Sequence, residues 1–271
     1  MDALAAGIDA PHVLDQATIA AYRRDGFVKV PEAIFAEAIA AYRPEITRLV
    51  HDHARNAKPL ETRDTYGKAF LQVSNLWETS DVVKEFVSGR RLARIAAELM
   101  GVDGVRIYHD QALYKEAGGG VTPWHCDQVY WPLATQHTIT AWIPLQAVPI
   151  EMGPLAFSVG SQRCRFGRDL TIGDESEALL ARTLKDLPID ESPFALGDVS
   201  FHSGWTFHRA GANRSTMTRE VMTIIYVADG ARIGVPRSRS QEMDLQRWMP
   251  GAKPGDPVDT RLNPLVYSSR E

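Results

Sequence analysis

The tripeptide His125-Cys126-Asp127 is the arrangement of residues with the clearest chemical potential in this sequence. Side chains two positions apart on a strand point to the same face, so the imidazole and the carboxylate can lie side by side. With a histidine from another strand they would form the two-histidine, one-carboxylate triad that binds Fe(II) and leaves coordination positions open. The pattern is common on its own, and a surface histidine beside an acid in a turn would also explain it.

Two later histidines are candidates for the third ligand. His202 and His208 lie in the segment GDVSFHSGWTFHRAGANRS, residues 197–215, which we interpret as a strand, a turn and a second strand ending at His208. A hairpin that continues from His208 and returns would bring Arg219 close to the metal. A guanidinium there could bind a carboxylate through two hydrogen bonds.

The elements that must position these residues change character along the chain. From about residue 15 to 100, apolar side chains recur at steps of three and four, which predicts a helical layer. Pro44 is expected to bend or divide one helix, and Ser88-Gly89 to break another. The expected helices are residues 18–24, 34–50 and 80–100.

From about residue 104 to 230 the apolar period is two, which predicts many short strands with one helical interruption at 175–187. Five prolines and many charges follow, so we expect an irregular tail from about 231 to 271. Helices followed by strands indicate an α+β protein with a β-sandwich or barrel core. We expect residues 1–271 to form a single domain.

Composition excludes several classes of protein. The 271 residues are 44% hydrophobic and 24% charged, which is typical of a globular chain. The formal net charge of -4 offers no basic excess for nucleic acid, and no run of about 18 apolar residues could span a membrane. The first residues lack the basic and apolar runs of a signal peptide. Cys126 and Cys164 form no CxxC pair and fit a reducing compartment, so we expect a cytoplasmic protein.

From the DGFVKV segment around Phe27 to the strand at 221–227, the chain resembles the phytanoyl-CoA dioxygenase family of Fe(II)- and 2-oxoglutarate-dependent oxygenases. The most specific parts are TPWHCDQ, HTITAWIPL, and GDVSFHSGWTFHRAGANRS followed by Arg219. The resemblance implies a double-stranded β-helix, a jelly-roll or cupin-like barrel, flanked by N-terminal helices.

The same resemblance implies roles for individual residues. His125, Asp127 and His208 would bind the iron, and Arg219 would bind the far carboxylate of 2-oxoglutarate. His208 is preferred to His202 because it directly precedes the GANRS turn that follows the family's ligand; His202 is then a hydrogen-bonded pocket or core histidine.

Further residues are expected near the co-substrate and the prime substrate. Thr140 and Trp142 share one face of a strand, which we place inside the barrel. Gln111 and Lys115 match the family's pocket less tightly and could equally serve the sheet or a loop. The expected 2-oxoglutarate neighbours are Trp142, Thr140 and Gln111. The expected substrate-pocket residues are Tyr130, Trp131, Phe201 and Lys115, although aromatic residues in strands are often core.

The resemblance implies that Fe(II), 2-oxoglutarate and O₂ act together to oxidise a small-molecule metabolite, with release of succinate and CO₂. Because Asp127 occupies the position of a small residue in relatives that halogenate, hydroxylation is expected. Desaturation, epimerisation or cyclisation at the same centre remains open. Two alternatives from other classes are a hydrolase or isomerase with a zinc-type ion at the same ligands, and a non-catalytic β-barrel binding module. The sequence predicts no oligomeric state.

Overall fold

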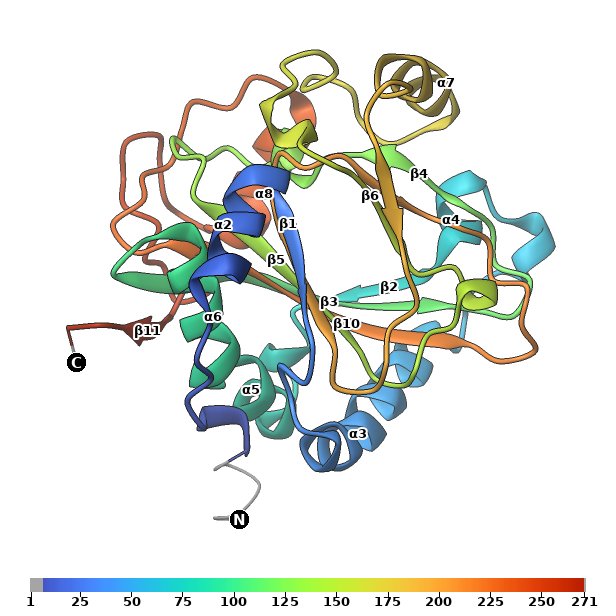
Figure 1. Ribbon diagram of the computed structural model, residues 1–271, viewed down its shortest axis with the longest axis horizontal. Helices are drawn as coiled ribbons and strands as arrows, with labels where there is room; N and C mark the ends of the chain where they lie inside the picture. Colours follow the sequence, from blue (N-terminus) through green and yellow to red (C-terminus); the bar gives the residue numbers. More distant parts are fainter. Residues whose placement is uncertain (1–6, 271) are drawn as a thin grey trace.

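The computed structural model describes residues 7–270, and there the chain forms two facing antiparallel sheets with helices packed mainly against one of them (Figure 1). The expectation about a signal peptide falls on residues 1–6, outside this part. No helix in the described part is long and apolar enough to cross a membrane. The helices are α2 (Gln16–Asp25), α3 (Ala36–Ala54), α4 (Thr65–Ala69), α5 (Asp81–Val87), α6 (Arg90–Met100), α7 (Asp174–Thr183) and α8 (Arg239–Trp248).

The strands of residues 7–270 divide into a seven-stranded and a four-stranded sheet, the double-stranded β-helix expected from the sequence, and the two do not close into a continuous barrel. The larger sheet has the order β1-β8-β5-β10-β3-β11, and β2 also pairs with β3. Its strands are β1 (Phe27–Val30), β2 (Leu71–Ser74), β3 (Gly104–Lys115), β5 (Thr138–Pro144), β8 (Val199–Ser203), β10 (Arg219–Ala228) and β11 (Leu265–Ser268). The smaller sheet, in the order β4-β9-β6-β7, comprises β4 (Thr122–His125), β6 (Leu155–Ser158), β7 (Ile189–Glu191) and β9 (His208–Ala210).

The main hydrophobic core lies between the larger sheet and helices α2, α3, α5 and α6. Along strand β5, side chains alternate between this core and the opposite face of the sheet. Ile139, Ala141 and Ile143 belong to this core, whereas Thr140 and Trp142 line a pocket on the opposite face, between the sheets. The alternation along β5 therefore orients two predicted site residues toward the interior of the jelly roll.

The helical layer agrees with the sequence prediction in its main features. The break at Ser88-Gly89 separates α5 from α6, and Gly101 ends α6 in the left-handed region at φ 72°. Helix α3 continues through Pro44 without dividing. Strand β2, which the helical period did not predict, adds to the edge of β3.

The expectation of an irregular tail was wrong for two segments, Arg239–Trp248 and Leu265–Ser268, which form a helix and a strand. Helix α8 begins after Ser238, whose side chain accepts a hydrogen bond from the backbone N–H of Gln241 at 3.2 Å, and β11 pairs with β3. Pro236 and Pro250 lie outside α8, so the prolines bound the helix instead of preventing it. Trp248 is buried against residues of the larger sheet, which stabilises the tail by removing apolar surface from water.

The expected hairpin from His208 to Arg219 was also wrong. His208 begins β9 in the smaller sheet, and Arg219 begins β10 in the larger one, so the turn between them crosses from sheet to sheet. The Asn213 side-chain amide holds this crossing by donating to the carbonyl oxygens of Lys115 at 3.0 Å and Met217 at 2.7 Å. The side chains of His208 and Arg219 nevertheless both face the space between the sheets.

Candidate active site

Three side chains with metal-binding atoms converge between the two sheets. His125 ends β4, Asp127 begins the following 3₁₀ turn, and His208 begins β9; one ligand atom from each lies within 4.8 Å of the others. His125 and His208 are cross-strand partners with ring centroids 4.2 Å apart. Their Nδ1 atoms donate to the carbonyl oxygens of Pro123 and Thr206, at 2.8 and 3.0 Å. These bonds leave both Nε2 atoms available to a metal.

The Asp127 carboxylate is oriented by neighbours on two strands of the larger sheet. Oδ2 accepts a hydrogen bond from Thr140 Oγ1 at 2.9 Å and lies 3.3 Å from His202 Nε2. Oδ1 lies 3.7 Å from Nε2 of both His125 and His208. Burial alone would raise the pKa of Asp127, but the surrounding histidines, His208 foremost, hold it well below its usual range.

The two histidine ligands are neutral at physiological pH because burial lowers the pKa of His125 and of His208 to about 4. An ionised carboxylate with two neutral imidazoles is the state in which such groups bind a divalent cation. This nitrogen and oxygen donor set fits Fe(II).

His202 lies beside the three ligands and outside the group that converges. It pairs with Thr140 across β8 and β5, and both contact the same oxygen of Asp127. His202 is therefore not the third metal ligand that it was considered to be as an alternative to His208. It is a buried pocket histidine that orients the Asp127 carboxylate.

Arg219 is a buried cation in the same pocket, with only 1% of its surface exposed. Its Nη1 donates to the carbonyl oxygen of Gly153, and its guanidinium lies 5.4 Å from the Trp142 ring centroid. Its Nε has no hydrogen-bond partner, and no carboxylate among residues 7–270 pairs with it. Burial lowers the pKa of Arg219 to about 9, which still leaves it charged at neutral pH. A cation buried without a counter-ion is costly, so an anionic ligand would be stabilised beside it.

Gly153 gives Arg219 its fixed position. It adopts φ 68°, and a Cβ there would lie 2.2 Å from the carbonyl oxygen of Gly211. A side chain would therefore push apart the segments before β6 and after β9. Only glycine allows this close approach.

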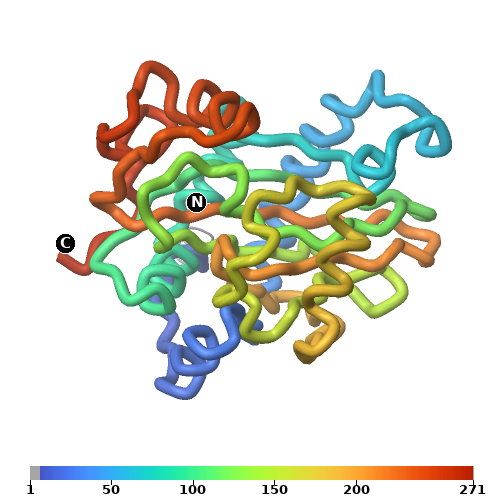
Figure 2. The backbone as a smooth tube through the Cα atoms, turned by 90° about the horizontal axis from the view of Figure 1, so that it is seen from above, coloured from blue at the N-terminus to red at the C-terminus, as the bar shows by residue number. Residues whose placement is uncertain are grey.

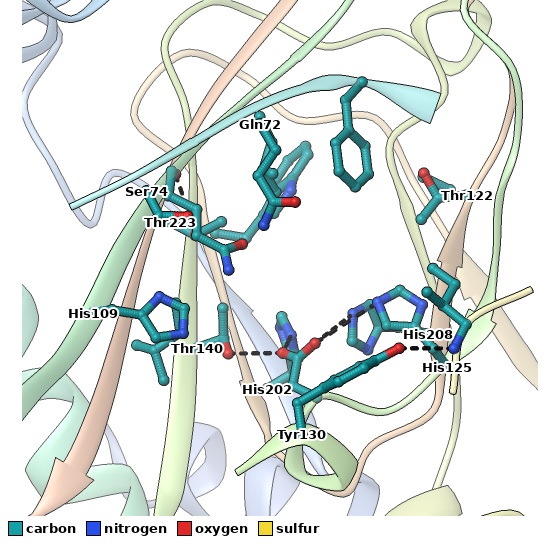
Figure 3. A pocket seen from close by; sticks show the side chains of 18 of the residues that line it. Gln72, Ser74, His109, Thr122, His125, Tyr130, Thr140, His202, His208 and Thr223 are labelled. Atoms are coloured by element: carbon teal, nitrogen blue, oxygen red, sulfur yellow. Dashed lines mark hydrogen bonds and ion pairs between the residues drawn. The ribbon is translucent and has the colours of Figure 1, made fainter. Parts of the chain in front are cut away.

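The pocket that contains these groups has a volume of about 300 Å³ (Figure 3). Its residues fit 2-oxoglutarate, since a cation that can pair with a carboxylate and a metal-binding triad line the same cavity. Trp142 Nε1, also buried and without a partner, offers a further donor.

Most of the residues predicted to surround the co-substrate and the substrate line the pocket. They are Thr140, Trp142, Gln111, Tyr130 and Trp131.

Two predicted pocket residues lie elsewhere. Phe201 packs in the core against the helices, because it neighbours His202 on β8 and so points to the opposite face. Lys115 donates from Nζ to the carbonyl oxygens of Gly120 at 2.5 Å and Gly211 at 2.8 Å, which ties β3 to the smaller sheet. Burial, assisted by the nearby Arg219 charge, lowers the pKa of Lys115 to about 6.

The outer part of the pocket was not predicted from the sequence. In Figure 2 the C-terminal segment, in red, and the segment near residue 65, in cyan, lie along the same edge of the molecule. No local spacing signals these residues, because they come from α4, β2, β3 and α8. They are Tyr66, Phe70, Gln72, His109, Asp244, Arg247 and Trp248.

A jelly roll with such a triad and a buried, unpaired arginine between its sheets defines the class of non-haem iron enzymes that use a 2-oxo acid. The chain belongs to the phytanoyl-CoA dioxygenase (PhyH) family, whose model matches residues 22–221.

Curated relatives are themselves dioxygenases. The chain is 26% identical over 166 residues to ectoine dioxygenase of Streptomyces avermitilis, a match covering 59% of this chain and 55% of that protein. The chain thus spans about half the length of this relative. It is 22% identical over 223 residues to a probable alpha-ketoglutarate-dependent hypophosphite dioxygenase of Stutzerimonas stutzeri, covering 78% of this chain and 77% of the relative.

Similar solved structures extend the range of reactions. The alpha-ketoglutarate-dependent carbocyclase SnoK of nogalamycin biosynthesis has a TM-score of 0.77 at 26% identity, covering 95% of this chain and all (100%) of that one. The epimerase SnoN, solved with Fe³⁺, alpha-ketoglutarate and nogalamycin RO, has a TM-score of 0.76 at 27% identity, covering 93% and 98% of the two chains.

Proposed function

We propose that this protein is a non-haem Fe(II)- and 2-oxoglutarate-dependent oxygenase that hydroxylates a small-molecule metabolite and releases succinate and CO₂. The observation that carries the proposal is the buried Arg219, which has no counter-ion among the described residues and lies in the same pocket as the triad. Fe(II), when bound, supplies the activation of O₂ that drives decarboxylation of the 2-oxo acid.

The chain's own residues bind and orient in this proposal. His125, Asp127 and His208 would hold the metal, and a three-residue ligand set would leave coordination positions open for 2-oxoglutarate and O₂. Thr140 and His202 fix the Asp127 carboxylate. Arg219 and Trp142 bind the far end of 2-oxoglutarate, so its reactive end is directed toward the metal.

Epimerisation or cyclisation is a second candidate reaction at the same centre. The similarity to SnoK and SnoN supports it, because these proteins share about a quarter of their residues with this chain over nearly its full length. A zinc-type hydrolase or isomerase would give Arg219 no task, and a binding module would need neither the triad nor the arginine.

The decisive experiment measures succinate formation and O₂ consumption by metal-free protein that has been reconstituted with Fe(II) and 2-oxoglutarate. We expect slow succinate formation that requires both components and O₂, even without a prime substrate, and none with Zn(II). Absence of Fe(II)-dependent succinate would refute the oxygenase. Succinate production lost after Arg219→Met but retained after Arg209→Met would link the activity to this pocket.

We further propose that residues 1–271 act as one domain and that the protein is cytoplasmic. The first proposal is supported by β11, since the C-terminal segment completes the sheet that begins with β1. The second is supported by Cys126 and Cys164, which are both unpaired thiols.

A further inference from the structure

The pocket extends beyond the metal ligands to a polar wall formed by β2 and β3. Ser74 pairs with Gln111 across these strands, and His109 and Gln111 share the face of β3 that lines the pocket. Figure 3 shows Gln72, Ser74 and His109 across the cavity from His125 and His208. This wall takes no part in holding the metal.

Each side chain of this wall has at least one polar atom that makes no hydrogen bond within residues 7–270. His109 Nδ1 is buried without a hydrogen bond, and neither the Gln111 amide nor the Ser74 hydroxyl makes one. Gln72 uses only its carbonyl oxygen, which accepts from the Tyr66 hydroxyl at 2.5 Å. Gln72 is exposed and Ser74 and Gln111 are half-buried, so water can satisfy their polar groups. The buried His109 nitrogen is the group for which a missing partner is costly unless a ligand satisfies it.

A row across the larger sheet relates His109 to the metal ligands. Ile225 pairs with His109 on one side and with Thr140 on the other, and Thr140 pairs with His202. Thr140 and His202 both contact Asp127. Two strand spacings place His109 about 10 Å from Thr140. A molecule the size of one or two rings, bound at the metal, therefore reaches His109.

Helix α8 fixes the orientation of the His109 ring. The ring stacks on Trp248, with centroids 4.6 Å apart and planes inclined by 26°. Trp248 Nε1 donates to Asp244 Oδ1 at 2.9 Å, and the Tyr108 hydroxyl donates to Asp244 Oδ2 at 2.6 Å. Both Asp244 oxygens are thus engaged, so this carboxylate anchors Trp248. Burial lowers the pKa of His109 to about 3, so the imidazole is neutral, with one donor and one acceptor nitrogen.

Most other residues around this chamber are aromatic. The two charged residues come from α8: both Asp244 oxygens are engaged, and Arg247 is exposed and lies over the Trp248 ring, 4.3 Å from its centroid. Tyr66 and Phe70 come from α4 and the residue after it, Tyr130 and Trp131 from the turn after β4, and all four line the pocket. Aromatic faces favour flat rings, and the neutral polar wall favours groups that exchange hydrogen bonds without charge.

We propose that His109 is a specificity-determining residue that hydrogen-bonds a hydroxyl group of the prime substrate, and that this substrate is an uncharged, hydroxylated ring compound. The inference rests on the proposed function for the identity of the site and goes beyond it in naming the substrate class. His109 selects the ring's orientation, and the aromatic walls hold its faces.

Binding of two probes tests this without turnover. Protein loaded with Zn(II) and 2-oxoglutarate is titrated with resorcinol and with its dimethyl ether, and binding is followed by ligand-observed NMR. We expect the native protein to bind resorcinol about tenfold more tightly, the effect of one buried hydrogen bond that the ether cannot donate. His109→Phe, which keeps the stacking on Trp248, should reduce the preference to less than about twofold. His109→Gln should retain part of it.

The matched control is His51→Phe, the same substitution at an exposed position of α3, which should leave the preference unchanged. Equal binding of the two probes by native protein, binding of neither, or a full preference in His109→Phe would each overturn the proposal. If His109→Phe does not fold, the test uses His109→Gln: a preference for resorcinol as large as that of the native protein would then overturn the proposal. Probe selectivity without Fe(II)-dependent succinate would refute the oxygenase alone, whereas succinate formation without selectivity would refute only this inference.

Discussion

Replacing Arg219 with methionine removes the buried cation while keeping most of the side-chain volume. In the native chain the guanidinium is almost fully buried, Nε is unpaired, and only the Gly153 carbonyl oxygen accepts a hydrogen bond from it. The ligand-free protein therefore carries the cost of a desolvated, unpaired charge. We expect Arg219→Met to fold and, without ligand, to be no less stable than the native protein.

The magnitude of the binding defect follows from the pair that Arg219 would form. Removing one partner of a buried, hydrogen-bonded charge pair costs about 2–5 kcal/mol. The corresponding loss of 2-oxoglutarate affinity is roughly 30- to 3000-fold. Arg219→Lys should restore only part of it, because an ammonium cannot present the planar pair of donors.

Thermal unfolding with Fe(II) under anaerobic conditions is the assay. At a 2-oxoglutarate concentration 100 times the native dissociation constant, binding stabilises the native protein by about 2.7 kcal/mol, or about 5–10 °C in Tm. Arg219→Met should retain at most about a third of this shift, and almost none at the upper end of the expected affinity loss. The control is Arg209→Met, since Arg209 lies 4.0 Å from Glu177 and is partly exposed. A native-sized shift in Arg219→Met would refute the assignment of this residue to 2-oxoglutarate.

Three further predictions concern the metal and the histidines. In a metal titration, iron binding should be abolished in each of three variants, His125→Ala, Asp127→Ala and His208→Ala. His202→Ala should still bind iron, with about 10–100-fold lower affinity. If His202→Ala alone lost iron, the ligand assignment would be wrong. Because the Asp127 carboxylate occupies the position a halide would need, mass spectrometry should find no halogenated product when chloride or bromide is added. The pKa of His109, lowered to about 3 by burial, lies below the 6.5 of an unperturbed histidine, so the unfolded chain takes up this proton first. The folded protein therefore keeps its full stability above pH 6.5 and loses stability as the pH falls below it. His109→Phe should reduce the pH dependence of the free energy of urea unfolding of the metal-free protein by up to about 1.4 kcal/mol per pH unit between pH 6.5 and about 4. An unchanged pH dependence in His109→Phe would contradict the burial of the His109 ring.

The sequence predicted the centre of the site because its information is local. His125 and Asp127 are two residues apart, and their shared direction follows from strand geometry alone. The same alternation could have excluded Phe201, since a pocket-facing His202 sends its neighbour to the other face. That error was avoidable from the sequence.

The outer pocket could not be predicted in the same way. His109 has no ligand partner near it in sequence, and its role emerges only when α8 places Trp248 against it. Helix α8 was not predicted because the prolines of the tail indicate turns locally. The helix is stabilised by the tertiary burial of Trp248, which local sequence does not show.

The placement of α8 has a consequence for how this chain can diversify. The segment that matches the family model ends at residue 221, whereas α8 begins at Arg239, so the two walls of one cavity are encoded in separate stretches of the gene. Mutations that alter the contour of α8 leave the residues around iron untouched. Exchanging this tail between relatives would therefore change the outer wall of the cavity while leaving the metal-binding residues in place.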